Sequence, residues 1–379
     1  MKKILEEKIM NIGLLGFGFM GKTHAYAIQN MNYFYGKLPF KAKITGVCTR
    51  SYETASAAVD EYNLGKAVTD EDELINDPDI DIIDICTPNI YHYESLKKAI
   101  AVGKYIYCEK PLCINDAQAF EIVELASQRG IIGQVVFNYR FMAPILRAKQ
   151  LINDERLGRI LSFRCAYLHN SCTDLNKNAG WKQNKDICGG GVLFDLGSHA
   201  IDLMYYLCGE FAGVIGRGQI AHKTRKGMDG QLWETNADEA FYIIAELKNG
   251  AYGTIEANKI AIGENDGLTF EIFGEKGALK FDLMEPNWLH FYDDTRQGGE
   301  LGGDKGFTRI ECVGRFPAPG NIFPSIKAPV GWLRAHVGSM YSFLNSVHYN
   351  RPATPSFSDA AHVQWVMEQA YKSDEKCTL

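Results

Sequence analysis

The chain has 379 residues, of which 46% are hydrophobic and 23% are charged, and its formal net charge is −6. This length allows two domains with full hydrophobic cores, and the composition is typical of a globular protein. The charges form no acidic or basic block, and no apolar run approaches the roughly 18 residues of a membrane span. We therefore expect neither nucleic acid nor a membrane as a partner.

The cysteines predict a reduced, cytoplasmic protein. All 10 are scattered along the chain, and none form a C-x-x-C pair. Several lie in apolar runs, where a free thiol acts as a small hydrophobic side chain. At the N-terminus, Glu6 and Glu7 interrupt the apolar stretch, which argues against a signal peptide. We expect no disulfide framework and no metal site.

The first part of the chain alternates strand-like runs with helical patterns. The strand-like runs occupy residues 8–21 (ending in glycines), 41–49, 66–69, 79–88, 104–109 and 131–139. The helical patterns lie between them, at 22–31, 52–63, 70–78, 91–103 and 114–130. Strands separated by helices at this spacing build a doubly wound parallel sheet. We predict an α/β Rossmann domain at residues 1–140.

The second part, residues 141–379, predicts an α+β domain with a largely antiparallel sheet. Strand runs joined by hairpin signals such as "KNG" and "EKG" occupy 159–170, 211–222, 239–262 and 268–283. Helical patterns flank them at 195–209, 333–350 and 358–373, and the glycine-rich stretch 293–306 is predicted to be an exposed loop.

Residues 240–247, "AFYIIAEL", indicate a strand with two apolar faces. Phe241, Ile243 and Ala245 lie on one face, and Tyr242 and Ile244 lie on the other. We expect helices to cover one face and a second subunit to cover the other, so the protein is predicted to be a homo-oligomer, either a dimer or a tetramer.

A G-x-G-x-x-G motif at Gly16, Gly18 and Gly21 ends the first strand and opens the first helix. In this context the first glycine permits a tight turn, the second lets the backbone approach a pyrophosphate, and the third lets helix and strand pack closely. The N-terminus of the helix then faces the phosphates. The motif predicts a nicotinamide dinucleotide as the cofactor.

The end of the second strand leaves the choice between NAD and NADP open. An acid that holds the ribose 2′-hydroxyl is expected there, but the chain has Thr49, Arg50 and Ser51, and its first acid is Glu53. An arginine with hydroxyls can accommodate a 2′-phosphate, which favours NADP mildly. A missing acid is also compatible with NAD.

Two further segments reach the same edge of the predicted sheet. Lys110, in "CEKPL", follows the fifth strand, and Thr87, Pro88 and Asn89 follow the strand before it. Because ligands bind at the carboxyl ends of parallel strands, these residues are predicted to border the cofactor crevice. His92 is expected at the same edge.

The segment "GGGVLFDLGSHAIDLM", residues 189–204, places Asp195 and His199 four positions apart in a helical pattern. At about 100° per residue the two side chains share one face of an α-helix. A carboxylate beside an imidazole either satisfies a buried histidine or holds a proton-transfer group in place. Asp202 is interpreted as structural.

Taken together, G-x-G-x-x-G, "TPN…H", "CEKPL" and "GGGVLFDLGSHAID" resemble the Gfo/Idh/MocA oxidoreductase family over nearly the whole chain. The resemblance implies that Lys110, Asp195 and His199 are catalytic and close over the nicotinamide. "FNYRF" and "GRILSFRCAYLHN" are most similar to the levoglucosan and related glycoside dehydrogenases, which implies oxidation of a ring hydroxyl, typically at C3. The predicted cofactor-binding residues are Gly16, Gly18, Phe19, Met20, Gly21, Thr49, Arg50, Thr87, Pro88, Asn89, His92, Glu109 and Lys110.

Recognition of a polyol needs several side-chain donors and acceptors. The predicted substrate-binding residues are Lys110, Tyr139, Arg140, Tyr167, His169, Trp181, Lys182, Asp195 and His199. The sequence predicts an NAD(P)-dependent dehydrogenase of a sugar, glycoside or anhydrosugar. The alternatives are an inositol or cyclitol dehydrogenase, a redox-neutral NAD-dependent glycoside-processing enzyme, and a dinucleotide-binding sensor without turnover.

Overall fold

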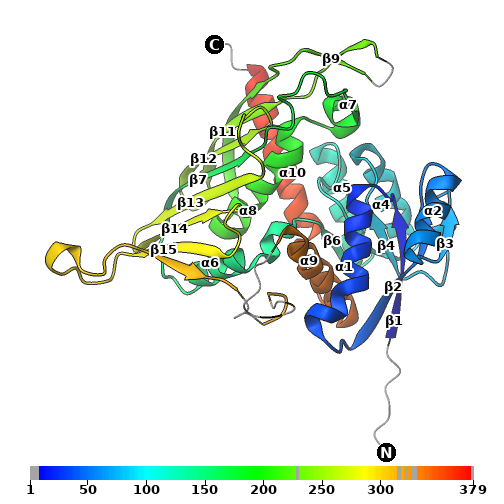
Figure 1. Cartoon of the computed structure of the whole chain (residues 1–379), viewed down its shortest axis with the longest axis horizontal. Coiled ribbons are helices and arrows are strands. Elements are labelled where there is room, and N and C mark those ends of the chain that lie inside the picture. Colours follow the sequence, from blue (N-terminus) through cyan, green and yellow to red (C-terminus); the bar gives the residue numbers. More distant parts are fainter. Residues whose placement is uncertain are drawn as a thin grey trace, which may run out of the picture. The chain divides into compact units, whose positions relative to one another are not determined.

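The computed structural model describes residues 8–227, 230–313, 317–320, 323, 325 and 331–376, and Figure 1 traces them along the chain. The described residues fall into two compact units. Unit 1 contains the chain up to Cys113, Ala117–Asn138 and the described part of Pro317–Ala361. Unit 2 contains Ile114–Asp116, the described part of Tyr139–Phe316, and the chain from His362 onward.

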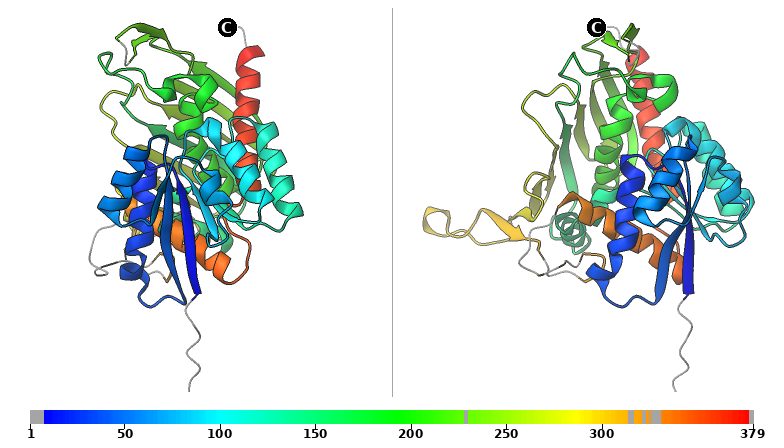
Figure 2. Two further views of the ribbon diagram at one scale, coloured as in Figure 1. Left: turned by 90° about the vertical axis from the view of Figure 1, so that its right-hand side faces the viewer. Right: turned by 45° about the vertical axis from the view of Figure 1, so that its right-hand side comes forward.

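Unit 1 is built on a parallel sheet, as the sequence predicts. Within the described chain, its strands are ordered β3-β2-β1-β4-β5-β6, which is the doubly wound order of a dinucleotide-binding domain. They are β1 (Lys8–Leu15), β2 (Phe40–Cys48), β3 (Lys66–Val68), β4 (Ile82–Ile85), β5 (Tyr105–Cys108) and β6 (Gly133–Val135). Helices flank this sheet on both sides (Figure 2). They include α1 (Phe19–Tyr35), α2 (Tyr52–Tyr62), α3 (Asp72–Ile75), α4 (His92–Ala101), α5 (Asp116–Gln128) and α9 (Trp332–His348).

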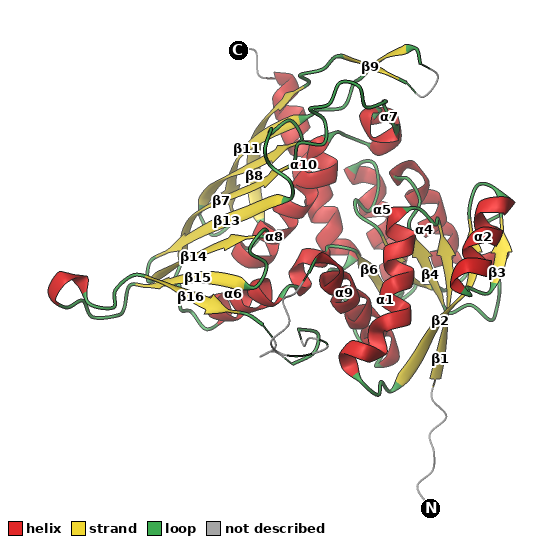
Figure 3. Ribbon diagram, in the orientation of Figure 1, coloured by secondary structure: helices red, strands yellow, loops and turns green. Residues whose placement is uncertain are grey.

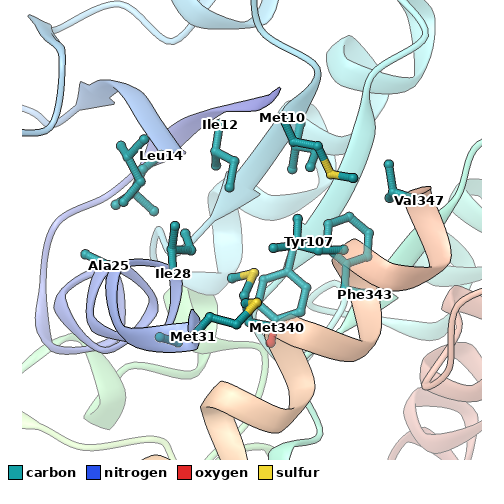
Figure 4. Packing of buried hydrophobic residues seen from close by; sticks show 14 of the residues in the cluster. Met10, Ile12, Leu14, Ala25, Ile28, Met31, Tyr107, Met340, Phe343 and Val347 are labelled. Atoms are coloured by element: carbon teal, nitrogen blue, oxygen red, sulfur yellow. The ribbon is translucent and has the colours of Figure 1, made fainter. Parts of the chain in front are cut away.

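The core of unit 1 joins segments from opposite ends of the sequence. Helix α9 packs against α1, and side chains from both meet those of β1 and β5 (Figure 4). Tyr107, on β5, is fully buried there and donates a hydrogen bond to Ser339 Oγ on α9 at 2.7 Å. The predicted division at residue 140 therefore differs from the structure, because the chain returns to unit 1 with α9. An amphipathic helical pattern does not specify which sheet the helix covers, so the sequence did not reveal this return.

Unit 2 contains a long, mostly antiparallel sheet, which confirms the predicted fold class (Figure 3). Its described strands are ordered β16-β15-β14-β13-β7-β12-β11-β8, and β12 runs parallel to β7. They are β7 (Ile160–Leu168), β8 (Phe211–Gln219), β11 (Ala240–Leu247), β12 (Tyr252–Asn258), β13 (Gly267–Gly274), β14 (Gly277–Asp282), β15 (Trp288–Asp293) and β16 (Phe307–Glu311). A separate ribbon pairs β9 (Thr224–Lys226) with β10 (Leu232–Glu234). The stretch 293–306, predicted to be a loop, connects β15 to β16 and contains one short 3-10 turn, Glu300–Gly302.

Helices α6 (Ala143–Asn153), α7 (Lys185–Cys188), α8 (Ser198–Cys208) and the later part of α10 (Phe357–Lys376) belong to unit 2. Helix α8 packs against β7 and β12, and the Tyr371 ring of α10 packs edge-on against Phe241 of β11. On β11, Phe241 is buried, as expected for the face that the helices cover, whereas Tyr242 and Ile244 are exposed. No helix in the described part of the chain is long and apolar enough to cross a membrane.

Candidate active site

The glycine loop has the geometry that a dinucleotide requires. Gly16 adopts φ +93°, a conformation that favours glycine, and its N–H donates to the Cys48 carbonyl at 2.8 Å. A Cβ on Gly21 would lie 2.3 Å from the Gly16 carbonyl oxygen, whereas a Cβ on Gly18 would meet no atom within 4 Å. The loop is therefore closed on its inner side and open at Gly18, where a pyrophosphate needs room. These residues fit the predicted cofactor.

The other predicted cofactor residues surround this loop or follow neighbouring strands. Phe19 is 73% exposed at the start of α1, Met20 is half-buried, and the Phe19 ring stacks on Trp332 of α9 at 5.7 Å between centroids. After β2, Arg50 is exposed, and the hydroxyl of Thr49 donates to the Ser51 carbonyl at 2.7 Å. After β4, Thr87 and Pro88 are half-buried and Asn89 is buried.

His92 and Glu109 support this edge from within. His92 is fully buried, and its ring nitrogens lie 2.8 Å from the Thr87 carbonyl and 2.9 Å from the Pro111 carbonyl. It therefore connects the loop after β4 to the segment of Lys110. The buried Glu109 carboxylate accepts a hydrogen bond from the Lys110 backbone N–H at 3.2 Å. His92 and Glu109 thus hold the backbone at this edge, and their contact with the cofactor stays a prediction.

A buried row of ionisable side chains, His24, Asp84 and Glu109, adjoins the backbone of Lys110. His24 Nδ1 is 2.9 Å from Asp84 Oδ1, and His24 Nε2 is 3.0 Å from Glu109 Oε1. Burial acts to lower the pKa of His24, but the Asp84 carboxylate raises this pKa well above its ordinary value, so the ring is an imidazolium. Burial and the positive charge of His24 lower the pKa of His336 to about 3, so the His336 ring is neutral. The sequence analysis assigned no role to this group.

This group also contains side chains of the types that bind metals. His24, Glu109 and His336 bring ligand atoms within 4.8 Å of one another, as do His24, Asp84 and Cys86. Both nitrogens of His24 already face carboxylates, however. The proton of the imidazolium therefore supplies the positive charge that a metal ion would otherwise bring.

Asp195 lies in unit 2, in a π-helical turn (Leu193–Gly197) directly before α8. This π turn leads directly into α8, on which His199 is the second residue, and the pairing of Asp195 with His199 stays a prediction. Its carboxylate contacts two ammonium groups: Lys182 Nζ is 2.9 Å from Oδ1, and Lys259 Nζ is 2.7 Å from Oδ2. π turns recur at functional sites. Lys182 was predicted to bind substrate, and Lys259 was not predicted at all.

His199, at the start of α8, is 9% exposed and adjoins a row of polar groups. Its ring packs edge-on against Tyr139 at 4.9 Å and Tyr167 at 6.1 Å between centroids. The two tyrosine hydroxyls are 2.6 Å apart, and Tyr167 donates to Asp266 Oδ1 at 2.7 Å. His169 Nε2 is 2.9 Å from the same oxygen. The structure thus brings together four predicted substrate residues, His199, Tyr139, Tyr167 and His169, and adds Asp266, which the sequence analysis missed.

Arg140, predicted to bind substrate, lies in the interior of unit 2. Its side chain is 5% exposed, and its guanidinium forms a two-pronged contact with Asp202, with Nη2 2.6 Å from Oδ1 and Nε 2.9 Å from Oδ2. The ring of Tyr206 lies 4.8 Å from the guanidinium carbon. This contact favours a structural role for both residues, and substrate binding by Arg140 stays a prediction. Trp181 is 39% exposed on the 3-10 turn that also carries Lys182.

A Rossmann sheet whose glycine loop leaves room for a pyrophosphate is the framework of a dinucleotide-dependent oxidoreductase, and the imidazole, ammonium and carboxylate groups of unit 2 are of the kind such enzymes use. Residues 10–137 match the oxidoreductase family with an NAD-binding Rossmann fold, and residues 145–280 match the GFO/IDH/MocA C-terminal domain. The chain belongs to the Gfo/Idh/MocA family of oxidoreductases, as its motifs indicate.

Individual relatives cover nearly the whole chain. Levoglucosan dehydrogenase of Pseudarthrobacter phenanthrenivorans is 30% identical over 97% of this chain and 96% of its own length. Glucose-6-phosphate 3-dehydrogenase of Bacillus subtilis is 25% identical over 96% of each chain. A solved structure of levoglucosan dehydrogenase in complex with NADH and levoglucosan superposes with a TM-score of 0.93 at 29% identity, covering 97% of this chain and 98% of that one.

Proposed function

We propose that this enzyme oxidises a ring hydroxyl of a pyranose, glycoside or anhydrosugar, at C3, to the ketone. The observation that carries this proposal is the similarity over the full length to levoglucosan dehydrogenase, in sequence and in fold. The relation to glucose-6-phosphate 3-dehydrogenase supports the position of oxidation. The nicotinamide, when bound, accepts the hydride from the carbinol carbon.

Side chains of this protein then accept the proton of the substrate hydroxyl and bind its oxygen. His199 accepts the hydroxyl proton as the C–H bond breaks, because an imidazole is suited to act as a base near neutral pH. Lys110 binds the same oxygen, and its charge stabilises the developing alkoxide. Asp195 orients His199 and stabilises the imidazolium that forms.

The polar row beside His199 supports a polyol as the substrate. Tyr139, Tyr167, His169 and Asp266 present hydroxyl, imidazole and carboxylate groups within hydrogen-bonding distance of one another. Burial acts to raise the pKa of Asp266, but its contacts with His169 and Tyr167 hold this pKa below the usual value. An ionised carboxylate is a strong acceptor for a sugar hydroxyl.

The test is cofactor reduction, followed by absorbance, on a panel of pyranoses, glycosides, levoglucosan, glucose 6-phosphate and inositols, each with NAD and with NADP. We expect turnover of a sugar with NAD, and a loss of roughly 10²-fold or more in kcat for both Lys110→Ala and His199→Ala. NMR of the product identifies the oxidised carbon. Turnover of inositols alone would favour the cyclitol alternative, and sugar conversion without net cofactor reduction would favour a redox-neutral cycle. Cofactor that binds without any conversion would indicate a sensor.

A further inference from the structure

Lys259 is a buried lysine that no sequence motif pointed to. It directly follows β12, where its backbone N–H donates to the Glu239 carbonyl at 2.8 Å and its carbonyl accepts from the Cys172 N–H at 2.9 Å. Its side chain is 8% exposed, and its ammonium lies 2.7 Å from Asp195 Oδ2. A buried ammonium is costly unless it is paired. Asp195 is therefore the group that makes the burial of Lys259 possible.

Another carboxylate near Lys259 has other donors. Asp238 accepts hydrogen bonds from the backbone N–H groups of Gly191 and Leu193, each at 3.0 Å, and from the Tyr371 hydroxyl. These contacts fix the segment that leads into the π turn. Asp195 is thus left as the direct ion-pair partner of Lys259. Burial acts to lower the pKa of Lys259, but Asp195 raises this pKa above its ordinary value, so the ammonium stays charged.

The two lysines that contact Asp195 have different environments. The Lys182 side chain is 46% exposed, so solvent and salt screen its charge, whereas that of Lys259 is shielded from water. A buried ion pair can often be replaced by apolar side chains without loss of stability, so stability alone does not require Lys259. Other titratable groups that act on this pair are Cys172, Cys188 and Asp238, and Asp238 in turn accepts the hydrogen bond of Tyr371.

We propose that Lys259 is a positioning residue for the reaction: its ammonium fixes the Asp195 carboxylate in its ionised form and balances the charge that Asp195 exerts on His199. This inference rests on the proposed function, in which His199 is the base. Without the balancing cation, the Asp195 charge favours the imidazolium, and the free base is available only at higher pH.

The experiment compares Lys259→Met, Lys259→Arg and Lys182→Met. For Lys259→Met we expect kcat to fall by roughly 10²-fold and the acid limb of the kcat/KM profile to move up by about one pH unit, with the NADH Kd from cofactor fluorescence unchanged. Lys259→Arg keeps the positive charge, so the acid limb of its kcat/KM profile should lie at the wild-type pH. Lys182→Met shifts the limb less, because its charge is screened. Wild-type kcat and an unshifted limb in Lys259→Met would overturn the proposal.

A cycle of urea unfolding on Lys259→Met, Asp195→Asn and the double variant tests the pair without turnover. Removing both partners should cost less stability than the two single changes added together, because neither single charge is then left buried alone. Additive losses would show that the two groups do not interact and would overturn the proposal at its base. The cycle can show coupling while the wild type turns over no substrate on the panel. In that case the proposed function and the kinetic role of Lys259 are both refuted, and only the Lys259–Asp195 ion pair is supported.

Discussion

Replacing Asp84 with asparagine removes one of the two carboxylates that hold His24 and leaves the shape of the side chain unchanged. Asp84 is fully buried, and its oxygens lie 2.9 and 3.1 Å from His24 Nδ1. A hydrogen bond to a charged group contributes about 1.5–3 kcal/mol, and removing one partner of a buried ion pair costs about 3–5 kcal/mol. Because Glu109 still faces His24 Nε2, we expect Asp84→Asn to lower the free energy of unfolding by about 2–3 kcal/mol near pH 6.

The loss should depend on pH in a defined direction. The folded-state pKa of His24 lies well above its unfolded value of about 6.5. The stabilisation from pairing is therefore complete below about pH 6.5 and is lost as the pH rises through the folded-state pKa. In Asp84→Asn that pKa is lower, so the stability difference between variant and wild type should shrink as the pH is raised.

Urea unfolding followed by tryptophan fluorescence, at about pH 6 and about pH 9.5, measures both effects. Cys86→Ala is the matched control, because the Cys86 thiol lies 3.1 Å from His24 Nδ1 and its pKa is raised by burial, so that it carries no charge. Its effect on stability should change little between the two pH values. If Asp84→Asn lowers the free energy of unfolding as much or more at alkaline pH, His24 is neutral in the native state. That result would refute the buried ion pairs of His24.

Three further changes test separate parts of the structure. Arg140→Met should lower the free energy of unfolding by about 3–5 kcal/mol, because it leaves Asp202 buried alone, and should leave the KM for substrate nearly unchanged; a raised KM at full stability would support its predicted binding role. Gly21→Ala places a Cβ where the Gly16 carbonyl lies and should weaken NADH binding at least roughly tenfold in a fluorescence titration, whereas unchanged affinity would contradict the tight loop. Ile244→Glu, on the exposed face of β11, should dissociate the expected oligomer in size-exclusion chromatography with light scattering, and an unchanged mass would place the interface elsewhere.

The features that the sequence predicted are those that short segments determine. Gly16 is required by its positive φ, and Gly21 by the close approach of the Gly16 carbonyl within the same strand-to-helix turn, so their spacing alone indicated the loop. The alternation on β11 likewise separated Phe241, which is buried, from Ile244, which is exposed. Both patterns depend on local periodicity, which a single sequence contains.

The features that it did not predict depend on contacts between distant segments. Helix α9 has an ordinary amphipathic pattern, and only the packing of side chains such as Phe343 assigns it to unit 1. The π turn at Asp195 inserts a wider turn into a pattern that fits an α-helix equally well. Periodicity cannot distinguish these cases, because the helix and its alternatives share nearly the same spacing of apolar residues.

Charged residues show the same limit most clearly. Arg140 lies in an aromatic stretch typical of a binding site, yet its guanidinium pairs with Asp202 from α8 in the interior. Lys259 ends an ordinary strand run, yet its ammonium pairs with Asp195. Whether a buried charge is structural or functional depends on which opposite charge the fold places beside it, because an unpaired charge cannot remain buried. Residue type and spacing therefore identify the groups that can do the chemistry, and the three-dimensional pairing decides which of them are available for it.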